Sequence, residues 1–241
     1  MTDFKMTLSF LGFFNGITAL ISMIISIIIG LFFFYQSKRK KAALLNYAGL
    51  MIIFASFLYL GVSIDFLSCI LIGYNMNNEI GLRGILSYMW VPFTLILAIY
   101  IGTKLMNIEK KKIIITFYII MALIYWYFLF TDPFGTFDFI YPTNSGDELI
   151  DTSFNETSIT FILIAFFLIS GFLIDGVGFL LLAIKSSGFL RRRFLYLSIG
   201  VVIFCISGAF EALFSLGILL LIIRILLILS AVFFYIGLKR A

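Results

Sequence analysis

Long runs of apolar residues, separated by short charged segments, form the dominant pattern of this chain. Most runs have no charge at all. The run between Lys41 and Glu79 is broken only by Asp65, and the run between Glu156 and Lys185 only by Asp175. Because about 20 mainly apolar residues suffice for one membrane crossing, each run predicts at least one transmembrane helix.

The last run, from Arg193 to Lys239, is too long for a single helix. A tight turn at Ser215, Leu216 and Gly217 divides it into two. The pattern therefore predicts an all-α fold, a single seven-helix transmembrane domain over residues 1–241. The predicted spans are residues 9–35, 43–72, 83–105, 113–131, 158–184, 194–215 and 218–238.

Composition supports an integral membrane protein. Hydrophobic residues make up 63% of the chain and charged residues 12%, whereas soluble domains carry about 25% charged residues. The chain has no histidine, which excludes histidine-dependent triads, metal sites and proton relays. Cys69 and Cys205 lie in apolar runs and are expected to be small buried side chains. We expect no catalytic residues, no metal site and no cofactor.

The basic residues predict the orientation. They follow spans 1, 3, 5 and 7, so all the clusters fall on one side, which is cytoplasmic by the positive-inside rule. The N-terminus is then outside and the C-terminus inside a multi-pass protein of the cell membrane. This distribution explains the net charge of +5 without a nucleic-acid partner. The clusters are Lys38, Arg39, Lys40 and Lys41; Lys104, Lys110, Lys111 and Lys112; Lys185, Arg191, Arg192 and Arg193; and Lys239 and Arg240.

The longest predicted loop, residues 132–157, lies outside and carries six acidic residues and no basic one. Such a loop is a candidate ligand lid or weak cation site. A solvated loop is the favoured interpretation. Asp132-Pro133 marks the end of span 4, because the residue before proline avoids the helical region.

Four charged residues lie inside the predicted spans: Asp65, Asp175, Glu211 and Arg224. Each costs about 2.5–3.5 kcal/mol on membrane-insertion scales. Glu211 and Arg224 lie at similar depths on antiparallel helices, and the neighbours of Arg224 on its own helix are apolar. The sequence therefore predicts an intramembrane Glu211–Arg224 pair, either a structural clamp or a ligand-linked switch.

Arg83 stands at the outer mouth of span 3, near the level of Asp65, and the two form a second candidate pair, for which Glu79 competes. Asp65, Arg83, Glu211 and Arg224 together make a candidate polar cluster with two acids and two bases. Such a cluster suits a binding pocket, and a purely structural network has the same composition.

Asp175 lies deeper, with no basic residue at its depth. It is a candidate proton or cation site, or else a carboxyl group that bonds a neighbouring helix. Pro92 is expected to kink span 3. Tyr125, Trp126 and Tyr127 fit an aromatic belt at the outer membrane interface.

One stretch of the chain resembles a known family. Residues 83–92 (RGILSYMWVP), followed by Ala98-Ile99-Tyr100, resemble the third helix of the seven-helix sensor region found at the N-terminus of many prokaryotic histidine kinases. Thr131-Asp132-Pro133-Phe134 is similar to that family's Thr-Asn-Pro signature, with Asp in place of Asn. The resemblance covers about residues 42–135 and implies a sensor. Family members usually continue into an output domain, whereas this sequence ends at Ala241 without a catalytic motif, so signalling would need a separate partner.

The combined expectation is a non-enzymatic sensor or receptor in the bilayer, acting through a separate cytoplasmic signalling partner or as a homo-oligomer. The alternative is a small solute, ion or proton transporter that uses the intramembrane carboxylates. A third interpretation is a structural or assembly protein. Retinal binding is disfavoured, because span 7 has no lysine before Lys239.

Overall fold

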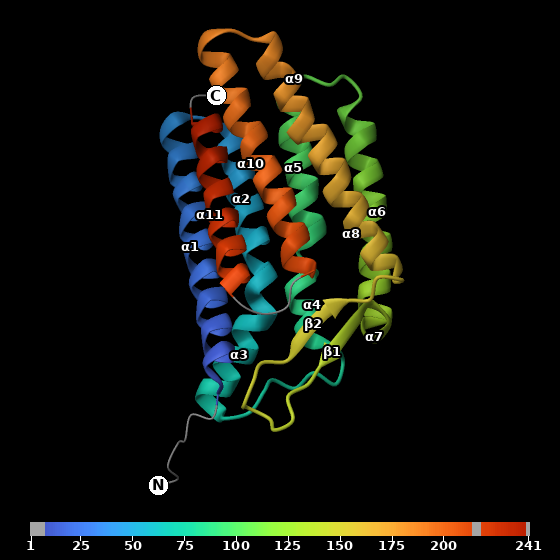
Figure 1. Cartoon of the computed structure of the whole chain (residues 1–241). Coiled ribbons are helices and arrows are strands. Elements are labelled where there is room, and N and C mark those ends of the chain that lie inside the picture. Colours follow the sequence, from blue (N-terminus) through green and yellow to red (C-terminus); the bar gives the residue numbers. More distant parts are fainter. Residues whose placement is uncertain (1–7, 214–217, 240–241) are drawn as a thin grey trace.

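The computed structural model describes residues 8–213 and 218–239, the side chains of residues 212, 213 and 218 excepted. Within these residues, seven helical segments are long and apolar enough to cross a membrane. They form one bundle (Figure 1), so the prediction of a mainly helical bundle with seven helices able to cross a membrane is confirmed. The segments are Phe10–Lys40, Ala43–Ile72, Leu82–Leu105, Lys111–Thr131, Ile159–Lys185, Gly188–Glu211 and Leu219–Leu238.

Several segments are divided into shorter elements. The second consists of α2, a turn of 3₁₀ helix (η1) and α3, and the fifth contains six residues of π-helix (η2). The element bounds are α1 Phe10–Lys40, α2 Ala43–Ser56, η1 Phe57–Tyr59, α3 Leu60–Ile72, α4 Leu82–Tyr88, α5 Val91–Leu105, α6 Lys111–Thr131, α7 Pro133–Thr136, β1 Phe137–Ile140, β2 Asp151–Phe154, α8 Ile159–Gly171, η2 Phe172–Val177, α9 Gly178–Lys185, α10 Gly188–Leu213 and α11 Ile218–Leu238.

Two helices extend beyond their predicted bounds at their basic ends. Helix α1 continues to Lys40 rather than ending at residue 35, and α10 begins at Gly188 rather than at residue 194. Lysine and arginine are good helix formers, and basic residues in the last turn of α1 also suit the helix dipole. The apolar pattern ends before the helix does. The turn predicted at Ser215, Leu216 and Gly217 lies outside the described residues.

Glycines allow the first two helices to approach closely. A Cβ atom at Gly49 would lie 2.7 Å from the carbonyl oxygen of Gly30, and one at Gly30 would lie 2.8 Å from the carbonyl oxygen of Gly49. Close backbone contact of this kind stabilises helix pairs in lipid, where no hydrophobic effect drives helices together. Helix α1 also packs on α3 and α11, and α10 packs on α11.

The third span is interrupted near Pro92. Helix α4 ends at Tyr88, α5 begins at Val91, and Pro92 occupies the first turn of α5. The sequence predicts a kink at Pro92, and the structure places the interruption just before it. Proline has no N–H to donate to the carbonyl four residues earlier, which belongs to Tyr88.

Side chains of α6 satisfy the carbonyls at this interruption. The Tyr125 hydroxyl donates to the Tyr88 carbonyl at 3.1 Å, and the Trp126 indole N–H donates to the Met89 carbonyl at 2.8 Å. The prediction of an aromatic belt is therefore wrong for Tyr125, which is fully buried, whereas Tyr127 is 63% exposed. Tyr125 and Trp126 face the third span because the interruption in its helix leaves carbonyl groups to which they donate.

Residues 132–157 are ordered into a short helix, α7, and an antiparallel hairpin rather than a simple solvated loop. Strand β1 pairs with β2 in a register that sets Phe137 opposite Phe154. Both phenylalanines are buried, and Phe137 packs against Gly84 of α4. The Asp132 carboxylate caps α7 by accepting from the Gly135 N–H at 2.9 Å. The sequence does not reveal the hairpin because the buried side chains of residues 132–157 are interspersed with exposed acidic residues.

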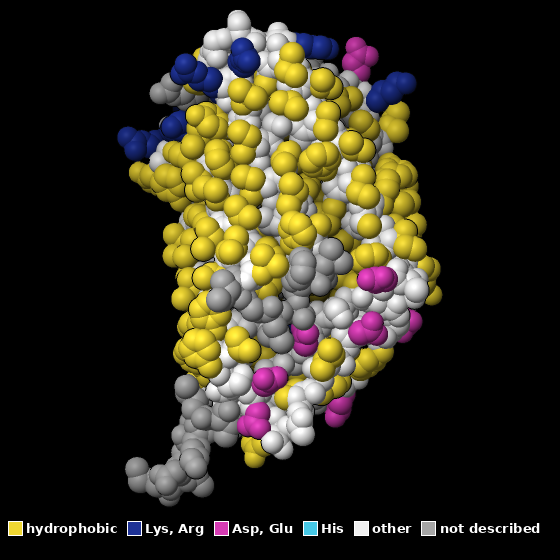
Figure 2. All heavy atoms as spheres, viewed as in Figure 1, with side chains coloured by type: hydrophobic (Ala, Val, Ile, Leu, Met, Phe, Trp, Pro, Cys, Tyr) yellow, Lys and Arg dark blue, Asp and Glu magenta, His cyan; other side chains and the backbone are white. Residues whose placement is uncertain are grey.

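The two ends of the bundle differ in charge. Lys and Arg side chains gather at one end, and most of the visible acidic side chains lie at the other, around the hairpin (Figure 2). Hydrophobic side chains cover the face between them. We call these the basic end, formed by residues 38–41, 104–112, 185–193 and 239, and the hairpin end, formed by residues 73–81 and 132–157.

Candidate functional site

Arg224 is held deep in the bundle by α1. The Arg224 side chain is 2% exposed. Its Nη1 donates to the Asn15 carbonyl at 2.9 Å and to the Thr18 hydroxyl, and its Nη2 donates to Asn15 Oδ1 at 2.7 Å. The guanidinium carbon lies 5.2 Å from the centre of the Tyr59 ring. Helix α1 thus supplies the polar groups that the apolar neighbours of Arg224 on α11 lack.

The structure also brings Glu211 to Arg224. Oxygen Oε1 of Glu211 lies 3.5 Å from Arg224 Nη2, which is longer than both contacts to Asn15. The predicted pair is therefore one arm of a larger junction, which we call the Arg224 junction: Asn15, Thr18, Glu211 and Arg224. Sequence reasoning missed Asn15 and Thr18, although each is a polar residue in an otherwise apolar run.

Arg83 forms a second group with Asp65 and the hairpin. Its Nε lies 3.9 Å from Asp65 Oδ2, and its Nη1 donates to the Thr152 hydroxyl of β2. Glu79, the predicted competitor, is exposed and takes no part in this pair. Arg83 is 4% exposed, so its charge is enclosed between α3 and the hairpin.

Asp65 accepts more from backbone and amide groups than from Arg83. Its Oδ1 accepts from the Met76 N–H at 2.9 Å, and its Oδ2 accepts from the Ile150 N–H at 2.8 Å. The Asn75 side-chain amide approaches both oxygens, at 3.2 and 3.3 Å. Hydrogen bonds to a carboxylate are roughly twice as strong as those between neutral groups. Asp65 therefore fixes both the loop after α3 and the hairpin onto the bundle.

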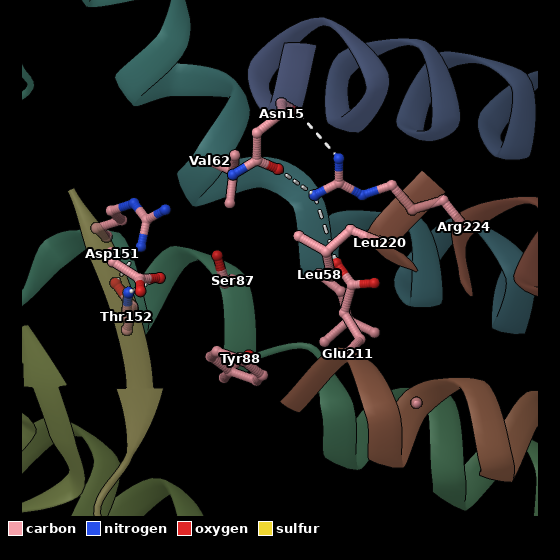
Figure 3. Close-up of a pocket in the computed structure, with 12 residues that line it drawn as sticks. Asn15, Leu58, Val62, Ser87, Tyr88, Asp151, Thr152, Glu211, Leu220 and Arg224 are labelled. Atoms are coloured by element: carbon pink, nitrogen blue, oxygen red, sulfur yellow. Dashed lines mark hydrogen bonds and ion pairs between the residues drawn. The ribbon is translucent and has the colours of Figure 1, made fainter. Parts of the chain in front are cut away.

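A cavity of about 60 Å³ lies between the Arg224 junction and Arg83. That volume holds about two waters, each of which takes about 30 Å³ in the liquid. Figure 3 shows Asp151 and Thr152 on one side, Asn15, Glu211 and Arg224 on the other, and Ser87 and Tyr88 between them. The cavity lining contains Arg83, Glu211 and Arg224, three of the four residues of the predicted cluster, and adds Asp151. Asp65 pairs with Arg83 but is not among the lining residues.

Three charged groups around this cavity hold buried atoms without a hydrogen-bond partner in the described part of the chain. They are Arg83 Nε, Glu211 Oε2 and Arg224 Nε. Unsatisfied buried atoms of charged groups are costly. The arrangement is chemically suited to a small polar molecule that offers both an acceptor and a donor. It offers no histidine or cysteine nucleophile, and residues 8–213 and 218–239 contain no cluster of metal-ligand type.

Asp175 lies apart from this cavity. It sits in the π-helical segment η2 and is 2% exposed, and its Oδ1 has no hydrogen-bond partner among the described residues. A Cβ atom at Gly102 of α5 would overlap the Asp175 carboxylate, so glycine makes room for it. Single π-helical turns within α-helices are frequent at functional sites. The structure thus separates Asp175 from the other four predicted residues.

Comparison of the chain with protein-family models, with curated proteins and with solved structures gave no significant match. The site is therefore interpreted from its own geometry.

Proposed function

We propose that this protein is a seven-helix sensor or receptor of the cell membrane without enzymatic activity of its own. It binds a small polar ligand in the cavity and acts through a separate cytoplasmic partner or through a homo-oligomer. The observation that carries the proposal is the Arg224 junction, which ties α1, α10 and α11 together beside the cavity. The basic-end termini of the same three helices lie at residues 40, 188 and 238.

The positive-inside rule supports the orientation that this function needs. It places the basic end in the cytoplasm, the N-terminus outside and the C-terminus inside. The hairpin and the cavity then face the outer side, where an external ligand arrives. The hairpin contributes Asp151 and Thr152 to the cavity wall, so a ligand contacts both the hairpin and the helices.

A ligand group that pairs with Glu211 or Arg224 competes with the contact between them. The 3.5 Å distance makes that contact the longest in the junction, so it is the one most easily exchanged. Breaking it changes how α10 packs against α11, and helix shifts of about 1–2 Å are a common form of signalling movement. The ligand shifts the equilibrium only by its differential affinity for the two states.

A variant tests this coupling without any ligand. We expect Glu211→Gln to change the distance between spin labels at Lys110 and Arg191, two exposed basic-end positions, by about 1–2 Å. The measurement is pulsed electron resonance on protein in nanodiscs. Glu79→Gln, an exposed acid at the hairpin end, is the matched control and is expected to leave the distance unchanged. An unchanged distance in Glu211→Gln would contradict the sensor proposal.

A transporter is the second candidate, and the unpartnered Asp175 carboxylate favours it. Intramembrane carboxylates mark proton and ion pathways in many transporters. On the sensor proposal, we expect proteoliposomes containing the wild-type chain to take up no protons beyond the empty-liposome level, under an imposed potential or pH gradient. Uptake that Asp175→Asn abolishes and Asp138→Asn leaves intact would establish the transporter and overturn the sensor.

A further inference from the structure

The polar cavity adjoins a second cavity that is lined almost entirely by apolar side chains. The second cavity measures about 50 Å³ and shares Leu58, Tyr88 and Gly208 with the first. Beyond this shared wall it is bounded by side chains of α5, α8, α10 and α11, including Leu95 and Leu168. The Thr94 hydroxyl, which also lines it, donates to the Trp90 carbonyl within its own helix. Apolar cavities of this kind accept apolar guests rather than water.

The first cavity has charges of both signs around it. Arg83 and Arg224 carry the positive charges, and Glu211 and Asp151 carry the negative ones. Arg83 uses Nη1 for the hairpin and leaves Nε without a hydrogen-bond partner, and Glu211 leaves Oε2 without one, among the described residues. A ligand that carries one negative and one positive group complements both, because it offers an acceptor to the guanidinium of Arg83 and a donor to Oε2 of Glu211.

We propose that the ligand of this site is a small amino acid with an apolar side chain, such as leucine. This inference rests on the proposed function and names its ligand class. The carboxylate pairs with Arg83, the ammonium group pairs with Glu211 and Asp151, and the side chain enters the apolar cavity past Tyr88. The two cavities measure about 60 and about 50 Å³. Together they are smaller than the roughly 150 Å³ cavity that admits benzene, so leucine enters only when the wall that they share at Tyr88 moves.

Tyr88 connects such a ligand to the hairpin. Its ring lies in the wall of both cavities and packs on Phe137 of β1 and Phe154 of β2, with ring centres 5.4 and 4.5 Å apart. A side chain that enters the apolar cavity therefore contacts the ring that supports the hairpin. The head group contacts Asp151 and Thr152 of the same hairpin.

Four probes separate the head from the tail of the ligand. The experiment measures competition with radiolabelled leucine on protein in nanodiscs. Unlabelled leucine is expected to compete at least tenfold better than glycine, which lacks the side chain, because single methylene groups in apolar pockets already change binding about tenfold or more. It is also expected to compete at least tenfold better than 4-methylpentanoate, which lacks the ammonium group, and leucinol, which lacks the carboxylate.

Two variants locate the tail. Leu168→Phe enlarges a side chain in the apolar wall and is expected to weaken leucine binding at least tenfold while leaving glycine binding unchanged. Ile169→Phe, at a 60% exposed position of the same helix, is the matched control and is expected to bind like wild type. Equal leucine binding in Leu168→Phe and wild type would overturn the placement.

The other outcomes are equally decisive. Glycine binding as tight as leucine would overturn the apolar-tail inference and leave the polar receptor site of the proposed function standing. Equal binding of leucine and 4-methylpentanoate would overturn the zwitterionic head. No saturable leucine binding at millimolar concentration would overturn the ligand class and leave the receptor proposal standing, because the label distance in Glu211→Gln and the proton-uptake assay test that proposal separately.

Discussion

Replacing Arg224 by methionine is expected to destabilise the folded bundle by about 3–5 kcal/mol, the range for removing one partner of a buried, hydrogen-bonded charge. Arg224 donates to two acceptors of Asn15 and to Thr18, and it faces Glu211. Without the guanidinium, Asn15 Oδ1 and the Thr18 hydroxyl oxygen lose their donor and the Glu211 carboxylate loses its countercharge. The measurement is the free energy of unfolding in bicelles titrated with sodium dodecyl sulfate.

Two further variants make this result interpretable. Leu229→Met, at an exposed position of the same helix, is expected to change the free energy by less than about 0.5 kcal/mol. Adding Glu211→Gln to Arg224→Met is expected to restore part of the loss, because it removes the unpaired carboxylate. A loss below about 1 kcal/mol for Arg224→Met, the size of an ordinary exposed ion pair, would contradict a buried junction.

Asp65→Asn is expected to cost about 3 kcal/mol, because hydrogen bonds to a charged group contribute about 1.5–3 kcal/mol each and several are affected. The Asp65 carboxylate accepts from Met76, Asn75 and Ile150 and faces Arg83. An asparagine directs an NH₂ donor at one set of these donors and removes the negative charge that faces Arg83. The hairpin then detaches before the helices separate.

Hydrogen exchange distinguishes this local effect from general instability. The Ile150 amide is expected to exchange about 100-fold faster in Asp65→Asn, since about 1.4 kcal/mol corresponds to a tenfold change, while amides in the middle of α1 keep their protection. Asp138→Asn, at an exposed position of β1, is the matched control. Unchanged exchange at Ile150 would show that the carboxylate does not hold the hairpin.

The spans were predictable because membrane crossing depends on local apolarity. Residues 43–72 are predicted as one crossing and form one helical segment of spanning length, although their helix changes to 3₁₀ form at Phe57–Tyr59. The hairpin was not predictable in the same way. Its strands are only four residues long, and their burial comes from packing on Gly84 and Tyr88 of α4.

The candidate site was predictable in part. A charge in an apolar run signals a buried functional or structural role wherever it occurs, and this rule alone pointed to Glu211, Arg224 and Asp65. It could not select the partners of Arg224, because Asn15 lies 209 positions away in the chain. Nor could it show that Asp175 would lie in a π-helical segment outside the cavity.

By itself, the sequence determined the seven segments that are long and apolar enough to span a membrane, because hydrophobic length and the positions of charged residues act locally along the chain. Only the tertiary structure decided that Asn15 and Thr18 hold Arg224, that Asp65 fixes the hairpin, and that a polar and an apolar cavity meet at Tyr88. Those arrangements depend on how helices distant in sequence pack side by side, and each buried charge takes whichever polar groups that packing brings within hydrogen-bond distance.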